Sequence, residues 1–190
     1  GKVLEWDYPS AKWFVGARCN IAYNCLDRHM KTWRKNKVAL IWVGENDQER
    51  IFTYAELYRQ VNRCANALKK LGLQQGDRVT IYLPKIPEQV IAMLACARIG
   101  LIHSVVYSGF SAPALANRIN DAEAKLVITA DVGFDRGKII PLKPVVDEAV
   151  KTCPTIDHVV VVRREVQGPA LSVPKEIDWK EWLECERPVC

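Results

Sequence analysis

The sequence has no uninterrupted apolar run that approaches the roughly 18 residues of a membrane-crossing helix. Its first residues also lack the apolar core and small-residue cleavage site of a secretion signal. The hydrophobic content of 49% over 190 residues is nevertheless enough to bury the core of one ordinary domain. We therefore expect a soluble, cytoplasmic protein with no membrane partner.

Paired metal-binding motifs are missing as well. The seven cysteines are an odd number without a Cys-x-x-Cys pair, so we expect reduced thiols rather than a metal or redox site. None of the three histidines has a second ligand at suitable local spacing, and no metal site is predicted. The net charge of +5 is spread along the chain without a Lys/Arg block, which argues against a nucleic-acid partner and favours an anionic small molecule.

The familiar phosphate and nucleophile motifs are also absent. The chain contains no G-x-x-x-x-G-K-[ST], no G-x-G-x-x-G and no G-x-S-x-G. A P-loop, a dinucleotide fingerprint and a hydrolase elbow are therefore excluded.

What the sequence does contain is a regular alternation of strand and helix patterns. The short strands are apolar on both faces and separated by helices, as in a parallel sheet covered on both sides. We expect the α/β class, with a mostly parallel sheet flanked by helices. The predicted strands are 38–43, 79–83, 102–107, 126–129 and 158–162, and the predicted helices are 21–34, 53–71, 87–99, 111–121 and 144–152.

Two helix starts carry explicit signals. Asn20 is placed to cap the first helix, and Thr53 with Glu56 forms a capping box before the best-defined helix. Gly72 follows that helix where a left-handed cap is expected.

The pattern divides the chain into three parts. Residues 1–36 are predicted to be an irregular aromatic arm and a first helix, and residues 37–165 the α/β domain. Residues 166–190 are expected to be an irregular segment that leads into a missing downstream region, because the chain stops without a closing feature.

Ligands of open parallel sheets bind beyond the carboxyl ends of the strands, so the loops to inspect are 84–87, 107–111 and 130–138. In the second loop Gly109 could let a ligand approach the backbone, with Ser111 capping the next helix; the alternative is a tight connection with an ordinary cap. In the third loop Arg136 and Lys138 could hold a phosphate; the alternative is a solvated basic turn.

Six segments, in order along the chain, resemble the AMP-forming acetyl-CoA synthetase family of adenylate-forming enzymes. They are the 18-residue stretch 12–29, Phe52-Thr-Tyr-Ala-Glu-Leu57, Gly76-Asp-Arg-Val79, Tyr82-Leu-Pro84, Ala97-Arg-Ile-Gly100 and His103-Ser-Val-Val-Tyr-Ser-Gly-Phe-Ser111. The likeness covers roughly residues 10–165. It implies that the chain is part of the large N-terminal domain of such an enzyme.

The resemblance also implies the reaction: acetate and MgATP give acetyl-adenylate and pyrophosphate, and the CoA thiol then displaces AMP. In the family the phosphate-binding loop, the acyl pocket, the ribose-binding aspartate and the catalytic lysine lie downstream of residue 190. No catalytic residue is therefore assigned here, and the chain alone is expected to be inactive.

A CoA half-site is the part of the family's active site that falls inside this chain. The matching positions are Tyr107, Ser108, Gly109, Asp135, Arg136, Gly137, Lys138 and Ile140. Gly109 would permit approach, Tyr107 and Ile140 would give apolar contact, and Arg136 and Lys138 would neutralise phosphate. Asp135 departs from the family, which has a basic residue there.

Other interpretations stay open. The chain could be a fragment of a propionyl-CoA synthetase, or a non-catalytic module that binds CoA or a nucleotide or pairs with a separate catalytic subunit. In the leading interpretation its partners are CoA, acetate, ATP and the missing downstream part, and the uncovered apolar surface is expected to make the fragment self-associate.

Overall fold

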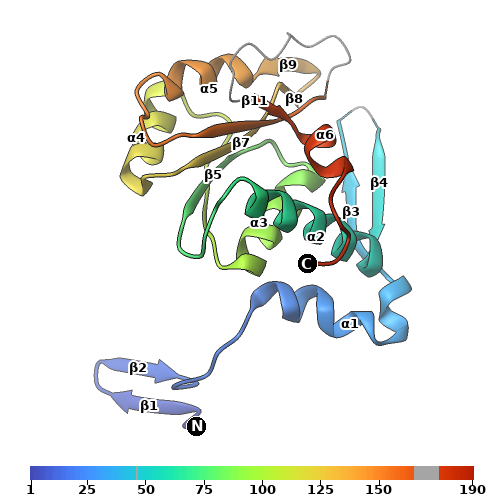
Figure 1. The fold of residues 1–190 in the computed structure, drawn as a ribbon, viewed down its shortest axis with the longest axis vertical. Coiled ribbons are helices and arrows are strands. Elements are labelled where there is room, and N and C mark those ends of the chain that lie inside the picture. The colour runs from blue at the N-terminus through green and yellow to red at the C-terminus, as the bar shows by residue number, and fades with distance from the viewer. Residues whose placement is uncertain (46, 165–175) are drawn as a thin grey trace.

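The computed structural model describes residues 1–45, 47–164 and 176–190. A five-stranded parallel sheet with the strand order β11-β10-β7-β5-β6 forms its centre (Figure 1). These strands are β5 (Arg78–Tyr82), β6 (Ile102–Val105), β7 (Leu126–Ala130), β10 (His158–Val162) and β11 (Glu176–Asp178). The predicted α/β class with a mostly parallel sheet is confirmed.

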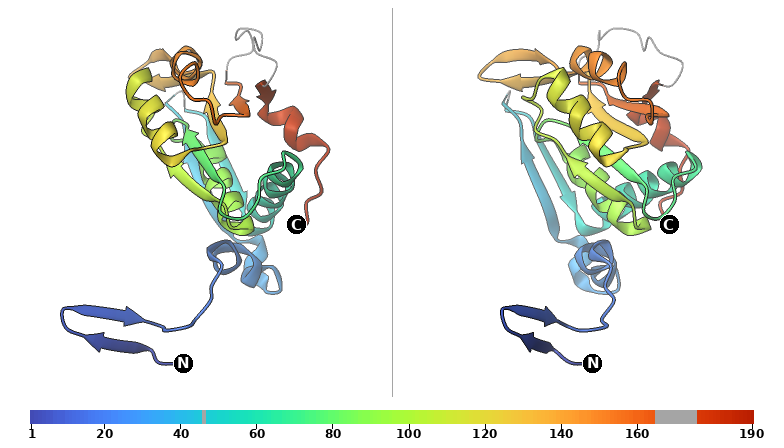
Figure 2. Two further views of the ribbon diagram at one scale, coloured as in Figure 1. Left: turned by 60° about the vertical axis from the view of Figure 1, so that its left-hand side comes forward. Right: turned by 90° about the vertical axis from the view of Figure 1, so that its left-hand side faces the viewer.

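Helices cover both faces of this sheet. On one face lie α4 (Ala112–Ala122) and α5 (Lys143–Val150), and on the other lie α2 (Tyr54–Lys70), α3 (Pro87–Ile99) and α6 (Trp179–Glu184) (Figure 2). Because the central strands are covered on both sides, β7 is buried along its whole length. All five predicted helices are present, although the first is shorter than predicted.

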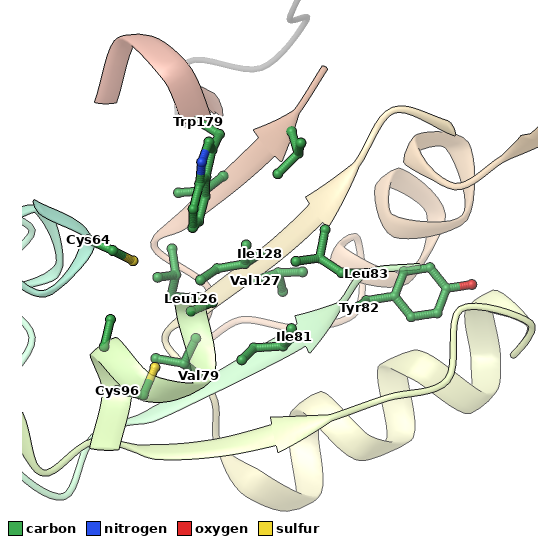
Figure 3. Packing of buried hydrophobic residues seen from close by; sticks show 14 of the residues in the cluster. Cys64, Val79, Ile81, Tyr82, Leu83, Cys96, Leu126, Val127, Ile128 and Trp179 are labelled. Atoms are coloured by element: carbon green, nitrogen blue, oxygen red, sulfur yellow. The ribbon is translucent and has the colours of Figure 1, made fainter. Parts of the chain in front are cut away.

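One part of the core lies between the sheet and the α2–α3 pair, and another lies under α4 and α5 on the opposite face. Figure 3 shows the thiol of Cys96 from α3 next to Val79 of β5, and the thiol of Cys64 from α2 directed towards Leu126 of β7. Burial raises the pKa of the Cys64 thiol well above its ordinary value and that of Cys96 to about 12. Both cysteines therefore serve as small apolar residues, as their positions in the helical patterns predict.

The predicted capping box of α2 is confirmed. The Thr53 hydroxyl oxygen accepts a hydrogen bond from the Glu56 backbone N–H at 3.2 Å, and a Glu56 carboxylate oxygen accepts one from the Thr53 N–H at 2.8 Å. Gly72 follows the helix with φ +82°, a conformation that side chains disfavour. The local sequence thus fixes both ends of α2.

The predicted irregular arm is instead a β-hairpin. Strands β1 (Leu4–Asp7) and β2 (Ser10–Trp13) pair antiparallel and project away from the body (Figure 2). Pairing the two strands satisfies backbone hydrogen bonds locally. The hairpin was not predicted because the aromatic residues of this segment do not recur at every second position. Trp6 and Tyr8 are 65% and 83% exposed.

The first helix begins where Asn20 predicts. The Asn20 side-chain oxygen accepts a hydrogen bond from the Tyr23 N–H at 3.2 Å. The helical stretch contains a π-helical turn η1 (Tyr23–Asp27) and then α1 (Arg28–Met30), and it is followed by a 3₁₀ turn η2 (Trp33–Asn36). The regular α-helix therefore ends before the predicted residue 34.

Two further hairpins stand outside the parallel sheet. The predicted first strand is present as β3 (Val38–Val43), but it pairs antiparallel with β4 (Glu49–Thr53). The region after β7, predicted as a loop, forms the hairpin of β8 (Val132–Asp135) and β9 (Lys138–Pro141).

The described part of segment 166–190 corrects the prediction of an irregular region. Its strand β11 joins the sheet beside β10, and the Asp178 carboxylate caps α6 by accepting from two backbone N–H groups. A buried ion pair between Lys143 and Glu176 ties β11 to α5. The predicted boundary at residues 165–166 lies outside the described residues.

Among the residues placed by the structure, no helix combines the length and apolarity that crossing a bilayer requires.

Candidate functional site

A cavity of about 490 Å³ lies at the carboxyl end of the parallel sheet. All three loops singled out from the sequence contribute to it, through residues 84–86, 107–109 and 133–135. The end of β3 and Arg164, two residues after β10, complete the wall. The cavity therefore occupies the place where open α/β sheets bind their ligands.

Five of the eight sequence-predicted site residues line this cavity. They come from two segments that the fold brings together: Tyr107, Ser108 and Gly109 after β6, and Asp135 with Ile140 on the β8–β9 hairpin. The other three do not line the cavity: Arg136 and Gly137 are exposed in the hairpin turn, and Lys138 is exposed at the start of β9. The basic side chains are thus at its rim rather than inside it.

The turn between β8 and β9 consists of two residues in the left-handed region. Arg136 has φ +52° and Gly137 has φ +73°, the combination of positive values that tight two-residue hairpins use. The Gly137 backbone N–H donates a hydrogen bond to the Glu45 carboxylate at 3.2 Å. This contact holds the hairpin turn next to the end of the β3 region.

The backbone around the Tyr107–Gly109 turn accepts hydrogen bonds from a buried tyrosine. The Tyr82 hydroxyl lies 2.8 Å from the carbonyl oxygens of both Ser108 and Phe110, and burial raises its pKa, so it remains a hydrogen-bond donor. Phe110 meets Tyr107 edge-on, with ring centroids 5.9 Å apart. The main chain of this turn is therefore fixed, whereas Tyr107 itself is 67% exposed.

Gly109 also leaves room for the neighbouring Tyr107 ring. A Cβ atom at this position would lie 2.4 Å from Cε1 of Tyr107, so a side chain here would displace the tyrosine ring. Ser111 occupies the N-cap position of α4, but its side chain makes no capping hydrogen bond. Of the two features predicted for this loop, the glycine rather than the serine shapes the cavity.

Trp42, Glu45 and Arg164, which lie outside the three loops marked from the sequence, also line the cavity, as does Lys85. The Trp42 indole donates a hydrogen bond to the Lys85 carbonyl at 2.7 Å, which joins the end of β3 to the loop after β5. Lys85 was within a loop marked for inspection. No local sequence signal assigns Trp42 and Arg164 to the cavity; only the tertiary structure shows that they line it.

Arg164 is the half-buried cation of the cavity. Its guanidinium carbon lies 4.5 Å from the centroid of the Phe134 ring, and its backbone N–H donates to the Asp131 carboxylate at 2.9 Å. Burial lowers the pKa of Arg164, while the nearby charges of Asp131, Glu88 and Glu45 act in the opposite direction. An arginine remains charged under such conditions.

The charged side chains of the cavity balance in sign. Glu45 and Asp135 are opposed by Lys85 and Arg164, so the lining is not a uniformly cationic surface. Among the described residues, no three His, Cys, Asp or Glu side chains are grouped closely enough to hold a metal ion.

Comparison with protein families places this fold. The profile described as AMP-binding enzyme matches residues 26–188. The chain belongs to the AMP-binding enzyme family. A second profile, the acetyl-coenzyme A synthetase N-terminus, matches residues 1–25, which contain the β1–β2 hairpin.

Individual members of this family are closely similar to the chain. Acetyl-coenzyme A synthetase from Methanothrix thermoacetophila is 58% identical over 164 residues, which are 86% of this chain and 25% of that protein. The enzyme of the same name from Chlorobaculum tepidum is 54% identical over 191 residues, covering 97% of this chain and 29% of its own length. The chain thus spans between a quarter and a third of these relatives.

A solved structure agrees with the fold. Acetoacetyl-CoA synthetase from Streptomyces lividans matches with a TM-score of 0.86 and 32% sequence identity, over 99% of this chain and 29% of that one. The AMP-binding family assignment therefore holds for both sequence and architecture.

Proposed function

We propose that this chain is the N-terminal part of an AMP-forming acetyl-CoA synthetase, and that its cavity holds the nucleotide end of CoA. One observation supports the site above all: Tyr107 and Ile140, 33 positions apart in the sequence, line the same cavity beyond the sheet. The acetyl preference rests on the names of the relatives and on the N-terminal profile.

The proposed reaction of the complete polypeptide has two steps. Acetate attacks the α-phosphate of MgATP to give acetyl-adenylate and pyrophosphate, and the CoA thiolate then attacks the acetyl carbonyl and releases AMP. We assign no catalytic residue and no Mg²⁺ ligand to this chain. Its part is to hold CoA, so the chain alone is expected to catalyse neither step.

The cavity has the character that an adenine nucleotide requires. Its volume falls within the roughly 300–1,000 Å³ of typical ligand pockets, and the Tyr107 ring offers an exposed aromatic face for a base. In the proposed arrangement Ile140 covers the other side, Ser108 and Gly109 supply the main-chain wall, and the turn residues Arg136, Gly137 and Lys138 lie at the rim.

Calorimetric titration of the 190-residue chain with CoA tests the site. Loss of base stacking in Tyr107→Ala is expected to weaken binding about tenfold, since such contacts are worth roughly 1–3 kcal/mol. Ile140→Ala should weaken it several-fold, whereas Ile139→Ala is the matched control because Ile139 is exposed on the same strand but outside the cavity. Equal effects of the two isoleucine variants, or no binding by the unaltered chain, would refute the site.

The rim is tested by the same titration with dephospho-CoA and with the double variant Arg136→Ala, Lys138→Ala. If the turn neutralises the 3′-phosphate, dephospho-CoA should bind the unaltered chain as weakly as CoA binds the double variant. Dephospho-CoA should then bind the double variant with little further loss of affinity. Additive losses would place that phosphate elsewhere.

The reaction is tested separately, by supplying the downstream polypeptide of a relative as a fusion. Acetate-dependent AMP formation is the expected result, with a slower rate for propionate. A faster rate with propionate would favour a propionyl-CoA synthetase, and no activity with either acid would refute the catalytic assignment.

A further inference from the structure

The guanidinium of Arg164 lies in a wall shared by two adjoining cavities. The second cavity, of about 230 Å³, has Trp42, Ile86, Phe134 and Arg164 in common with the first. The Phe134 ring, 4.5 Å from the guanidinium carbon, supports one face of this group. Arg164 is thus held between two hollows rather than extended into bulk solvent.

The carboxylates around Arg164 are engaged with other donors. An Asp131 oxygen accepts from the backbone N–H groups of Val132 and Arg164, at 2.7 and 2.9 Å. Glu88 forms an ion pair with Arg50 at 2.6 Å, and Glu45 accepts from the Gly137 N–H. These acids provide a favourable field for the cation without directly pairing with it.

Within the described ranges, the Arg164 guanidinium makes neither a hydrogen bond nor an ion pair. A half-buried guanidinium has lost part of its hydration, so solvent and salt screen its charge less than that of an exposed cation. An anionic ligand that enters the cavity would form charge-assisted hydrogen bonds with it, and the planar fork of arginine fits a phosphoryl group.

The cations of the hairpin turn are in a different position. Arg136 and Lys138 are exposed, so salt screens their fields and they lose flexibility when they bind a ligand. Arg164 is instead preorganised by Phe134 and by its position two residues after β10. A phosphoryl group inside the cavity therefore gains more from Arg164 than from either residue of the turn.

We infer that Arg164 is the phosphoryl-binding residue inside the cavity, and that it receives a phosphate of the CoA nucleotide. The identity of the ligand rests on the proposed function, whereas the anion site rests on Arg164 and its surroundings. Arg164 thereby becomes an affinity-determining residue in addition to the eight predicted from the sequence.

Nitrogen-15 NMR of the chain with inorganic pyrophosphate tests the anion site without CoA. The side-chain Nε–H signal of Arg164, assigned by its loss in Arg164→Gln, and the Phe134 amide are expected to shift in a saturable way. Arg164→Gln should weaken pyrophosphate binding at least tenfold. Arg164→Lys keeps the charge but loses the planar fork, so its affinity should lie between those of the unaltered chain and Arg164→Gln. A well-dispersed spectrum of each variant establishes that it is folded.

Arg136→Gln is the matched control, because it makes the same chemical change on the exposed turn and should weaken pyrophosphate binding less than twofold. Shifts confined to residues 136–138, or equal losses in the two glutamine variants, would overturn the inference. Absence of any pyrophosphate binding would also overturn it.

Titration with CoA separates this inference from the proposed function. If pyrophosphate binds at Arg164 but CoA does not bind, the anion site stands and the CoA assignment fails. If CoA binds the unaltered chain and Arg164→Gln equally well, the CoA assignment stands and the role of Arg164 is refuted.

Discussion

Asp135 and Lys138 are register partners that flank the two-residue turn of the β8–β9 hairpin. Directly opposed residues of an antiparallel pair have side chains close enough for their charges to interact. The carboxylate of Asp135 therefore reduces the positive field that Lys138 offers, and Asp135 itself lines the cavity. A position that the family resemblance implies to be basic is thus acidic here, next to the proposed nucleotide site.

Removing this negative charge should strengthen CoA binding. Asp135→Asn keeps the shape of the side chain and eliminates repulsion of the ligand's phosphates, an effect of roughly 0.2–1 kcal/mol for exposed charges, or up to about fivefold in affinity. Asp121→Asn is the control, because Asp121 is exposed on α4 and does not line the cavity. Calorimetry at low salt measures both, and equal affinities for the two variants would show that Asp135 does not act on the ligand.

The sequence predicted those elements whose signals are local. The strand and helix alternation, the capping box at Thr53 and the glycine at position 72 each need only a few neighbouring residues. The β8–β9 hairpin was missed because its turn places Arg136 at positive φ, where asparagine or glycine is the usual indicator. Strand β11 was missed because it has three residues and is tied down by a distant ion pair with Lys143.

The candidate site likewise contains some residues that the sequence identified and others that only the structure revealed. Tyr107 and Ile140 were identified by family resemblance, and the fold then explains why they line the same cavity. Arg164 gives no local signal, since an arginine after a strand is indistinguishable from a solvated terminus until the β3 end and the hairpin enclose it. Long-range packing, which periodicity does not contain, determines that part of the site.

The capping box predicts a defined loss of stability. Thr53→Ala removes the oxygen that accepts from the Glu56 N–H, and such substitutions cost about 1 kcal/mol. Ser111→Ala is the matched control, because Ser111 also occupies an N-cap but makes no capping bond, so its loss should change little. Urea unfolding followed by circular dichroism compares them, and similar midpoints for the two variants would contradict the prediction.

The same box predicts a pH dependence. Hydrogen bonds from the Thr53 backbone and then from its hydroxyl lower the pKa of Glu56 below its ordinary value of 4.5. A lowered pKa in the folded state stabilises the protein above the ordinary value, and this contribution is lost as the pH falls through the folded pKa. The stability difference between the unaltered chain and Glu56→Gln should therefore be largest near neutral pH and shrink below 4.5. A difference that grows in acid would reverse the sign of this interaction.

The ion pair between Lys143 and Glu176 is expected to hold β11 in the sheet. Their side chains are 7% and 1% exposed, and removing one member of such a pair typically costs about 3–5 kcal/mol. Lys143→Met should therefore destabilise the chain strongly, whereas Lys143→Met combined with Glu176→Leu should recover most of the loss. Lys151→Met is the control, because its pair with Glu148 is exposed.

Urea unfolding of the four proteins forms the test, and the fluorescence of buried Trp179, directly after β11, adds a local probe. If the double variant is as unstable as Lys143→Met, the loss comes from the packing of Lys143 rather than from its ion pair with Glu176.

Strand β6 should make the isolated chain self-associate. It is an edge of the sheet, pairs only with β5 among the described strands, and carries Ile102 and Val105 with 57% and 43% of their surface exposed. Unpaired N–H and C=O groups beside apolar side chains are a template for pairing with another chain. Ile102→Lys places a charge on this edge and should reduce association, because charged side chains on natural edge strands prevent pairing with other chains. Light scattering over a wide range of concentrations measures the effect, with Val189→Lys as a control outside the sheet. Should Trp6→Ser abolish association while Ile102→Lys leaves it intact, the exposed N-terminal hairpin rather than β6 is the contact.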